Sequence, residues 1–144
     1  MEEDVLVARA MYNHLNQWPD KPCRINMETM EKAPIAFSMS MQQLSGTVVL
    51  KKYIDGSYTG AWPFAVYVRL SGNDTAKKFD AIQLLTAISE WLRTTPPPDL
   101  GASRVPDKIE MTSLPAIAGA YEDGGIDYQA VFRLTYKQRS DYYV

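Results

Sequence analysis

The stretch IDYQAVFRLTYK, residues 126–137, is the clearest strand in the sequence and decides the fold. Its apolar side chains occupy alternate positions and share one face: Tyr128, Ala130, Phe132, Leu134 and Tyr136. Apart from Val131, the positions between them are polar: Asp127, Gln129, Arg133, Thr135 and Lys137. Such an alternation is typical of an antiparallel sheet that buries one face. We therefore expect Phe132 and Leu134 to be buried and Arg133 to lie outside the core.

Other segments add strands to this sheet. Residues 35–42 and 63–71 also alternate with a period of two, and Pro63 is tolerated because it opens its strand. Residues 25–30, 47–53, 108–112 and 116–121 are shorter strand candidates. Residues 122–125, Glu-Asp-Gly-Gly, predict a hairpin turn before the last strand.

Two helices complete the pattern. Residues 3–18 and 75–93 each carry an apolar stripe at the 3.6-residue period, and the second helix ends at three prolines, residues 96–98. The order helix, strands, helix, strands favours an α+β fold. We expect one domain over residues 1–144, with a mixed or antiparallel four- to five-stranded sheet and two long helices packed on one face.

Composition excludes several classes of protein. The chain has 144 residues, 46% of them hydrophobic and 22% charged, with a net charge of -2, which does not favour a dedicated nucleic-acid binder. A single cysteine permits no internal disulfide, and one cysteine with one histidine cannot supply the usual four-ligand zinc site. No apolar run approaches the roughly 20 residues of a membrane span, and the acidic start, residues 1–4, does not match a secretory signal.

No motif in the sequence predicts catalysis. His14 lies at the margin of the first helix's apolar stripe, and Cys23 lies between a proline and an arginine. The acidic residues of 122–127 are better explained by turn chemistry than by a metal site, and no phosphate-binding glycine motif is present. We predict no catalytic, cofactor-binding or metal-binding residues and no cofactor. The alternative, a small-ligand-binding enzyme, would need a deep pocket lined by His14 or Cys23.

Aromatic residues gather around residues 54–61. Nine tyrosines are many for this length, and Tyr53, Tyr58, Trp62 and Tyr67 bracket this loop. Ordinary strand preference and a protein–protein surface both account for them. Under the second interpretation, residues 54–61 form an extended, mobile arm in the free subunit. The candidate interface residues are Tyr58, Trp62, Phe79, Arg133 and Lys137, with Tyr58 the first choice.

Three segments carry a family resemblance. They are residues 54–69, the helix with Asp74-Thr75, Phe79-Asp80-Ala81 and Glu90-Trp91-Leu92, and residues 113–136 with Ser113-Leu114-Pro115-Ala116 and Ala120-Tyr121-Glu122-Asp123-Gly124-Gly125. In this order, over roughly residues 47–137, they resemble the tail terminator and minor capsid proteins of long-tailed bacteriophages and prophages.

The resemblance implies a structural role. A tail terminator forms a hexameric ring that caps the tail tube, stops its elongation and joins it to the head connector. The implied partners are further copies of the chain, the major tail tube protein and a head connector or completion protein, with no sequence-specific nucleic acid and no membrane. The implied location is the virion neck, assembled in the host bacterial cytoplasm. A head-completion or other neck ring protein is the alternative within the same class.

Overall fold

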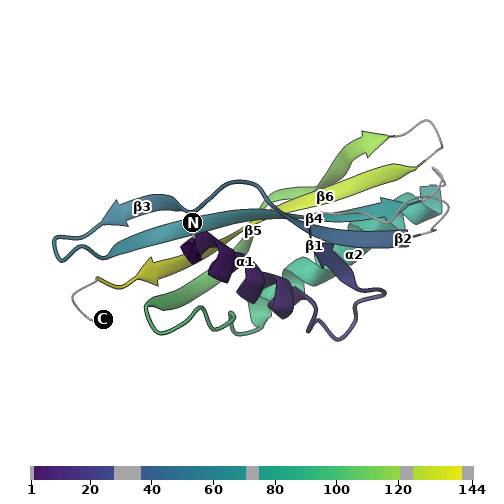
Figure 1. The fold of residues 1–144 in the computed structure, drawn as a ribbon. Coiled ribbons are helices and arrows are strands. Elements are labelled where there is room, and N and C mark those ends of the chain that lie inside the picture. Colours follow the sequence, from purple (N-terminus) through teal and green to yellow (C-terminus); the bar gives the residue numbers. More distant parts are fainter. Residues whose placement is uncertain (1, 28–36, 71–74, 121–124, 141–144) are drawn as a thin grey trace.

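The computed structural model describes residues 2–27, 37–70, 75–120 and 125–140, and within them the chain forms two helices and a six-stranded mixed sheet (Figure 1). The helices are α1 (Glu2–Leu15) and α2 (Thr75–Thr94). The strands are β1 (Ile25–Met27), β2 (Phe37–Gln43), β3 (Val48–Lys52), β4 (Tyr58–Leu70), β5 (Arg104–Ala120) and β6 (Ile126–Gln138). The predicted α+β class is confirmed, with one strand more than the four to five expected.

The sheet is built around the long strands β4 and β6. The strand order is β1-β2-β4-β6-β5, with β1 parallel to β2 and the other pairs antiparallel. Strands β2 and β3 lie in line along the same edge of β4, because β2 pairs with residues 64–70 and β3 with residues 58–61. The β3–β4 hairpin therefore extends the sheet at one end, away from the helices (Figure 1).

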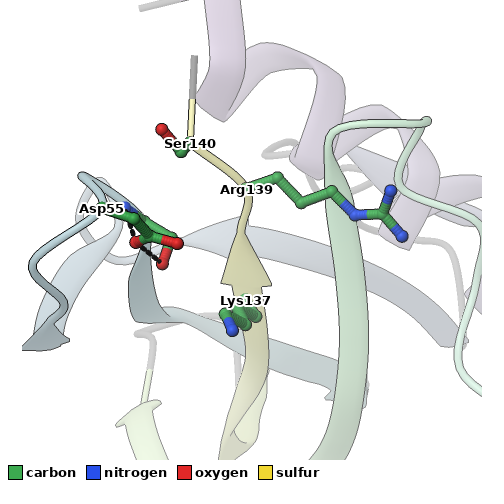
Figure 2. Close-up of a pocket in the computed structure, with 5 residues that line it drawn as sticks. Asp55, Lys137, Arg139 and Ser140 are labelled. Carbon is green, nitrogen blue, oxygen red and sulfur yellow. Dashed lines mark hydrogen bonds between the residues drawn. The ribbon is translucent and has the colours of Figure 1, made fainter. Parts of the chain in front are cut away.

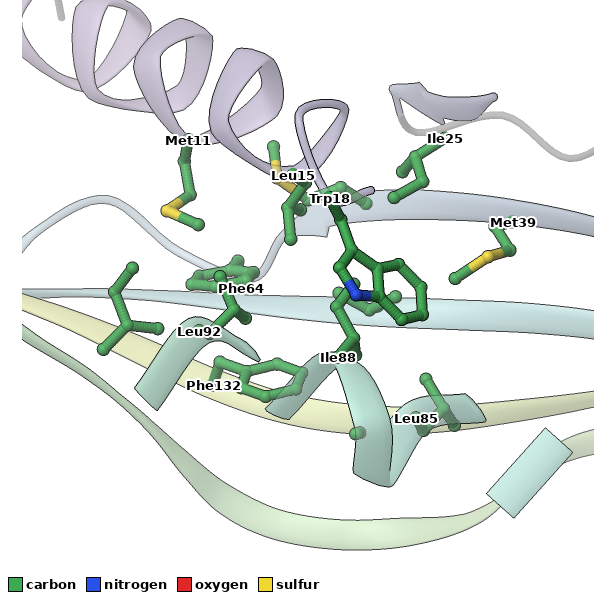
Figure 3. Close-up of a cluster of buried hydrophobic side chains, with 14 of the residues drawn as sticks. Met11, Leu15, Trp18, Ile25, Met39, Phe64, Leu85, Ile88, Leu92 and Phe132 are labelled. Atoms are coloured by element: carbon green, nitrogen blue, oxygen red, sulfur yellow. The ribbon is translucent and has the colours of Figure 1, made fainter. Parts of the chain in front are cut away.

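Both helices pack on one face of the sheet, as predicted. The even-numbered residues of β4 from Trp62 to Leu70 and of β6 from Ile126 to Tyr136 are buried and join one core with the apolar stripes of α1 and α2. Figure 3 shows side chains of α1 and α2 converging on Phe64 and Phe132. Phe132 and Leu134 are buried and Arg133 lies on the opposite face, as the alternation predicts. A one-residue shift of β6 would reverse this arrangement, so the alternation fixes its register.

Asn16 connects α1 to the edge strand. Its side-chain amide donates to the carbonyls of Tyr12 and Ile25, and its Oδ1 accepts from the backbone N–H of Ile25 at 3.0 Å. A single side chain thus satisfies backbone groups at the end of α1 and at the start of β1. This anchoring places α1 beside the edge formed by β1 and β2.

Two expectations about the strands need correction. Residues 58–61 are part of β4, paired with β3 on one side and β6 on the other, so the predicted arm is a paired hairpin rather than a free loop. Residues 108–112 and 116–121 were expected as separate strands, but β5 runs continuously to Ala120. Strand β5 accommodates Pro106 and Pro115 because it lies at the sheet edge and its register shifts at several points. The predicted turn at residues 121–124 lies outside the described residues.

Candidate protein–protein interface

The turn of the β3–β4 hairpin is held by its own polar groups. The N–H of Tyr53 donates to the carbonyl of Ser57, and the N–H of Gly56 donates back to the carbonyl of Tyr53. Gly56 has φ near +89°, a left-handed conformation that glycine adopts without steric cost. The Asp55 carboxylate accepts bonds from both the N–H and the hydroxyl of Ser57, which lowers the pKa of Asp55. The tip of the hairpin therefore has a defined shape and an ionised carboxylate.

The base of the hairpin depends on a close approach at Gly60. A β-carbon at this position would lie 2.6 Å from Cγ2 of Thr47 and 3.2 Å from Cε1 of Tyr58. Thr47 is itself fixed by a 2.7 Å hydrogen bond between its Oγ1 and the hydroxyl of Tyr136. Glycine is thus required where side chains from the segment before β3 and from β6 meet over β4.

The hairpin carries several exposed apolar side chains. All five residues of β3 are exposed, and they include Val48, Val49 and Leu50. At the tip, Ile54 has 108% of its reference surface exposed, so its side chain has no cover within the described chain. Single exposed apolar residues are ordinary, but a group of them on one projecting element indicates a protein-binding surface. We call residues 48–61 the hairpin arm.

A small cationic cluster lies at the side of the arm. The ammonium groups of Lys51 and Lys137 lie 5.3 and 5.0 Å from the centre of the Tyr53 ring, within the range of cation–π attraction. A shallow polar pocket beside it is lined by Asp55, Ser57, Lys137, Arg139 and Ser140. Figure 2 shows the Arg139 side chain extending away from the Asp55 carboxylate. The two cationic side chains of the pocket, Lys137 and Arg139, therefore do not converge on one point.

The sheet face opposite the helices carries ordered ion pairs. Arg69 donates two hydrogen bonds to the buried carboxylate of Asp127, at 2.7 and 3.0 Å. Farther along the same face, Arg133 donates to Glu110 at 2.6 Å and holds the pKa of that carboxyl below its usual range. Tyr67, beside the first pair, has a raised pKa because of its burial and, secondarily, the charge of Asp127. The charged groups of this face are thus held in fixed pairs.

Four of the five interface candidates from the sequence lie at least partly on the surface. Phe79 is 66% exposed on α2, Lys137 is exposed, and Arg133 is partly exposed beside its ion-pair partner. Tyr58 opens β4 and is partly buried. Their role as interface residues stays a prediction.

Trp62 is the candidate that the structure places elsewhere. Its side chain is fully buried and its ring packs on Phe64, with ring centres 5.3 Å apart. Because β4 already begins at Tyr58, Trp62 lies inside the strand, and alternation places it on the same helix-facing side as Phe64. Thr135 was also expected on the polar surface of β6 but is buried. Neither side chain is therefore available on the accessible surface of the subunit.

His14 and Cys23, the two residues that the enzyme alternative would use, are buried and partly buried, respectively. His14 is buried and stacks on Trp91, with ring centres 4.9 Å apart, and burial lowers the pKa of its imidazole. Cys23 is a free, partly buried thiol. Among the described residues, no group of three or more histidine, cysteine, aspartate or glutamate side chains could hold a metal ion. In the same part of the chain, no helix is both long and apolar enough to span a membrane.

Comparison with known proteins extends the description of the fold. No protein-family model matches the chain, and no curated protein matches its sequence. A similar fold occurs in a solved chain from a structure titled "Virion of native gene transfer agent (GTA) particle". The TM-score is 0.54, the identity 12%, and the match covers 94% of this chain and 84% of that chain. At this identity the likeness concerns the fold, and it extends over nearly the whole chain.

Proposed function

We propose that this chain is a structural component of a phage-like virion and that, within the virion, it is a tail terminator. In this role it forms a hexameric ring that caps the tail tube, stops further addition of tube protein and joins the tube to the head connector. The ring is a component of the virion neck and assembles in the cytoplasm of the host bacterium. The proposed partners are other copies of the chain, the tube protein and a connector protein.

One observation carries the proposal most directly. The fold matches a chain taken from an assembled virion over 94% of this sequence. The sequence resemblance to tail terminators, made from residues 54–69 and 113–136 among others, points to the same kind of particle. The two arguments use different features of the chain, since one rests on the course of the backbone and the other on side-chain identities.

The surface supports an assembly role. The projecting hairpin arm exposes four apolar residues: Val48, Val49, Leu50 and Ile54. Such exposed apolar residues favour association with another protein. A ring further requires two different patches on each copy, since its contacts run head to tail. The arm at one end of the sheet and exposed apolar residues elsewhere, such as Phe79 on α2, satisfy that requirement.

The proposal is tested by the growth of tail tubes. The purified chain is added to polymerising tube protein from the same genome, and tube lengths are measured by electron microscopy. A terminator arrests growth and leaves a ring at one end of each tube. Tubes that continue to grow with no ring attached would contradict the proposal.

The same assay separates the terminator from another neck ring. A head-completion protein would bind the isolated connector and leave tube growth unchanged. A small-ligand-binding enzyme would do neither. The enzyme alternative would place His14 in a ligand pocket, but its side chain is buried and stacked on Trp91.

A further inference from the structure

A second apolar feature lies away from the arm, on the first helix. A surface pocket opens between α1 and the ends of β1 and β2. Its helical wall consists of residues spaced at i, i+3, i+4 and i+7: Val5, Ala8, Arg9 and Tyr12. Met27 at the end of β1 and Gln43 at the end of β2 close the other side. We call this pocket the α1 socket. Val5 is 55% exposed at its edge, so the socket presents uncovered apolar surface.

The tip of the hairpin arm matches the socket in chemistry. Ile54 is a fully exposed branched apolar side chain, suited to an apolar cavity of side-chain size. Asp55, the next residue, is an exposed carboxylate. The socket carries the opposite charge at its rim, where Arg9 is exposed and forms no ion pair with another described residue. An apolar knob beside an anion thus corresponds to an apolar socket beside a cation.

The arm cannot reach the socket of its own molecule. Gln43, at the socket, pairs with Phe64 on β4, and the strand runs seven residues from there back to Ser57 at the turn. At about 3.3 Å per residue this separates the tip from the socket by roughly 23 Å. Within the arm, residues 58–61 of β4 are paired with β3 on one side and with β6 on the other, so the arm cannot fold back. Any contact between tip and socket must therefore join two molecules.

We propose that the hairpin tip of one copy docks into the α1 socket of a second copy, with Ile54 filling the socket and Asp55 pairing with Arg9. The inference deepens the proposed function, on which it rests, by assigning the head-to-tail contact of the ring. Knob and socket are different patches of the same chain, so the contact is heterologous and repeats from copy to copy. Each copy then receives one arm and offers one arm.

Disulfide trapping between two single-cysteine variants tests the contact. Both variants carry Cys23→Ser, which removes the only native thiol. Ile54→Cys protein is mixed with Val5→Cys protein, and in a parallel experiment with Met27→Cys protein, so that both walls of the socket are sampled. The matched control is Ile54→Cys mixed with Ile117→Cys, because Ile117 is as exposed as Val5, at 55%, but lies on β5.

We expect at least one socket variant to form the mixed disulfide on the order of tenfold faster than the control, because docking raises the effective concentration of the two thiols. A disulfide also requires Cα atoms within about 7 Å, so only direct neighbours are trapped. If neither socket position exceeds the Ile117→Cys control, the contact is overturned. The trapping uses the free protein at high concentration, where even a weak head-to-tail contact is transiently populated and is captured by the disulfide, so the contact is tested separately from the binding of tail tubes.

Charge exchange provides an independent measurement. Arg9→Asp and Asp55→Arg each place like charges together, and we expect each to weaken self-association on the order of tenfold. The double variant restores the pair with reversed sign but lacks the two Ser57 hydrogen bonds to Asp55, so it should bind at least about threefold more tightly than Asp55→Arg alone without reaching the parent affinity. Circular dichroism confirms that each variant is folded. If the double variant is as weak as the single variants, the pair is not formed. If such variants still cap tubes normally, the proposed function stands and this contact does not.

Discussion

The substitution Gly60→Ala tests how the hairpin arm is attached to the sheet. The added β-carbon would lie 2.6 Å from Cγ2 of Thr47. Thr47 is β-branched and its hydroxyl is bonded to Tyr136 at 2.7 Å, so it cannot rotate away without breaking that bond. Overpacking costs about 1–3 kcal/mol, and the lost hydrogen bond adds about 1 kcal/mol. We expect Gly60→Ala to lower the free energy of unfolding by about 2–4 kcal/mol, the sum of the two terms.

Thr47→Ser is the matched partner for this experiment, because it removes Cγ2 and keeps the bonded hydroxyl. Alone it should cost less than about 1 kcal/mol, the value of one methyl group that is only partly buried. Combined with Gly60→Ala it should recover about 1–2 kcal/mol relative to the sum of the single effects. Urea unfolding of the four proteins with unchanged m-values measures this coupling. Strict additivity, or a Gly60→Ala cost below about 0.5 kcal/mol, would refute the packing argument.

Three further outcomes follow from the structure. Trp62→Ala should lower the free energy of unfolding by about 3–5 kcal/mol, whereas Phe79→Ala should change it by less than about 0.5 kcal/mol, and equal effects in urea unfolding would contradict the assignment of Trp62 to the core. Because burial lowers the pKa of the single histidine, His14, below its ordinary value of 6.5, stability should be full above that pH and fall as the pH drops below it, by at most about 1.4 kcal/mol per pH unit. His14→Gln should flatten this fall between pH 7 and 5.5, and an unchanged slope would refute the account. Arg69→Met leaves its partner's carboxylate buried without its cation and should cost about 3 kcal/mol, whereas Arg133→Met breaks an exposed pair and should cost less than about 1 kcal/mol in the same denaturation assay.

Periodicity explains why most of the fold could be predicted from the sequence. The stripe of α2 and the alternation of β6 each extend over more than ten residues, and each is enforced by burial of one face against the other. The same alternation correctly separated Phe132 from Arg133. Helix and strand positions that contact the core could therefore be assigned without knowledge of their partners.

The hairpin arm could not be predicted in the same way, because its glycines and polar residues have more than one use. Residues 55–60, Asp-Gly-Ser-Tyr-Thr-Gly, are typical of a loop, but only the first three form the turn. Gly60 is needed for close packing against Thr47, and no local sequence pattern relates these two residues. Once β4 was expected to begin at Pro63 instead of Tyr58, Trp62 was left outside the strand and assigned to the surface.

The candidate interface depends even more on tertiary placement. The socket between α1 and the ends of β1 and β2 joins residues 5–12 with Met27 and Gln43, and no spacing in the sequence relates these segments. The exposure of Ile54 likewise depends on how far the hairpin projects beyond the helices (Figure 1). Side-chain types suggested a protein-binding surface, but the structure was needed to show where the apolar surface lies.

The central claim, a ring-forming assembly protein of the virion neck, is tested most directly by the mass of the chain on and off tail tubes. Sedimentation at high concentration, with and without tubes of the cognate tube protein, measures both states. Six copies of the 16.3 kDa chain amount to about 98 kDa, the mass of a closed hexamer. The account predicts that six copies per tube end sediment with the tubes, even if the free chain is monomeric because weak contacts are completed by the template. A dimer that resists dilution and does not associate with tubes would contradict it.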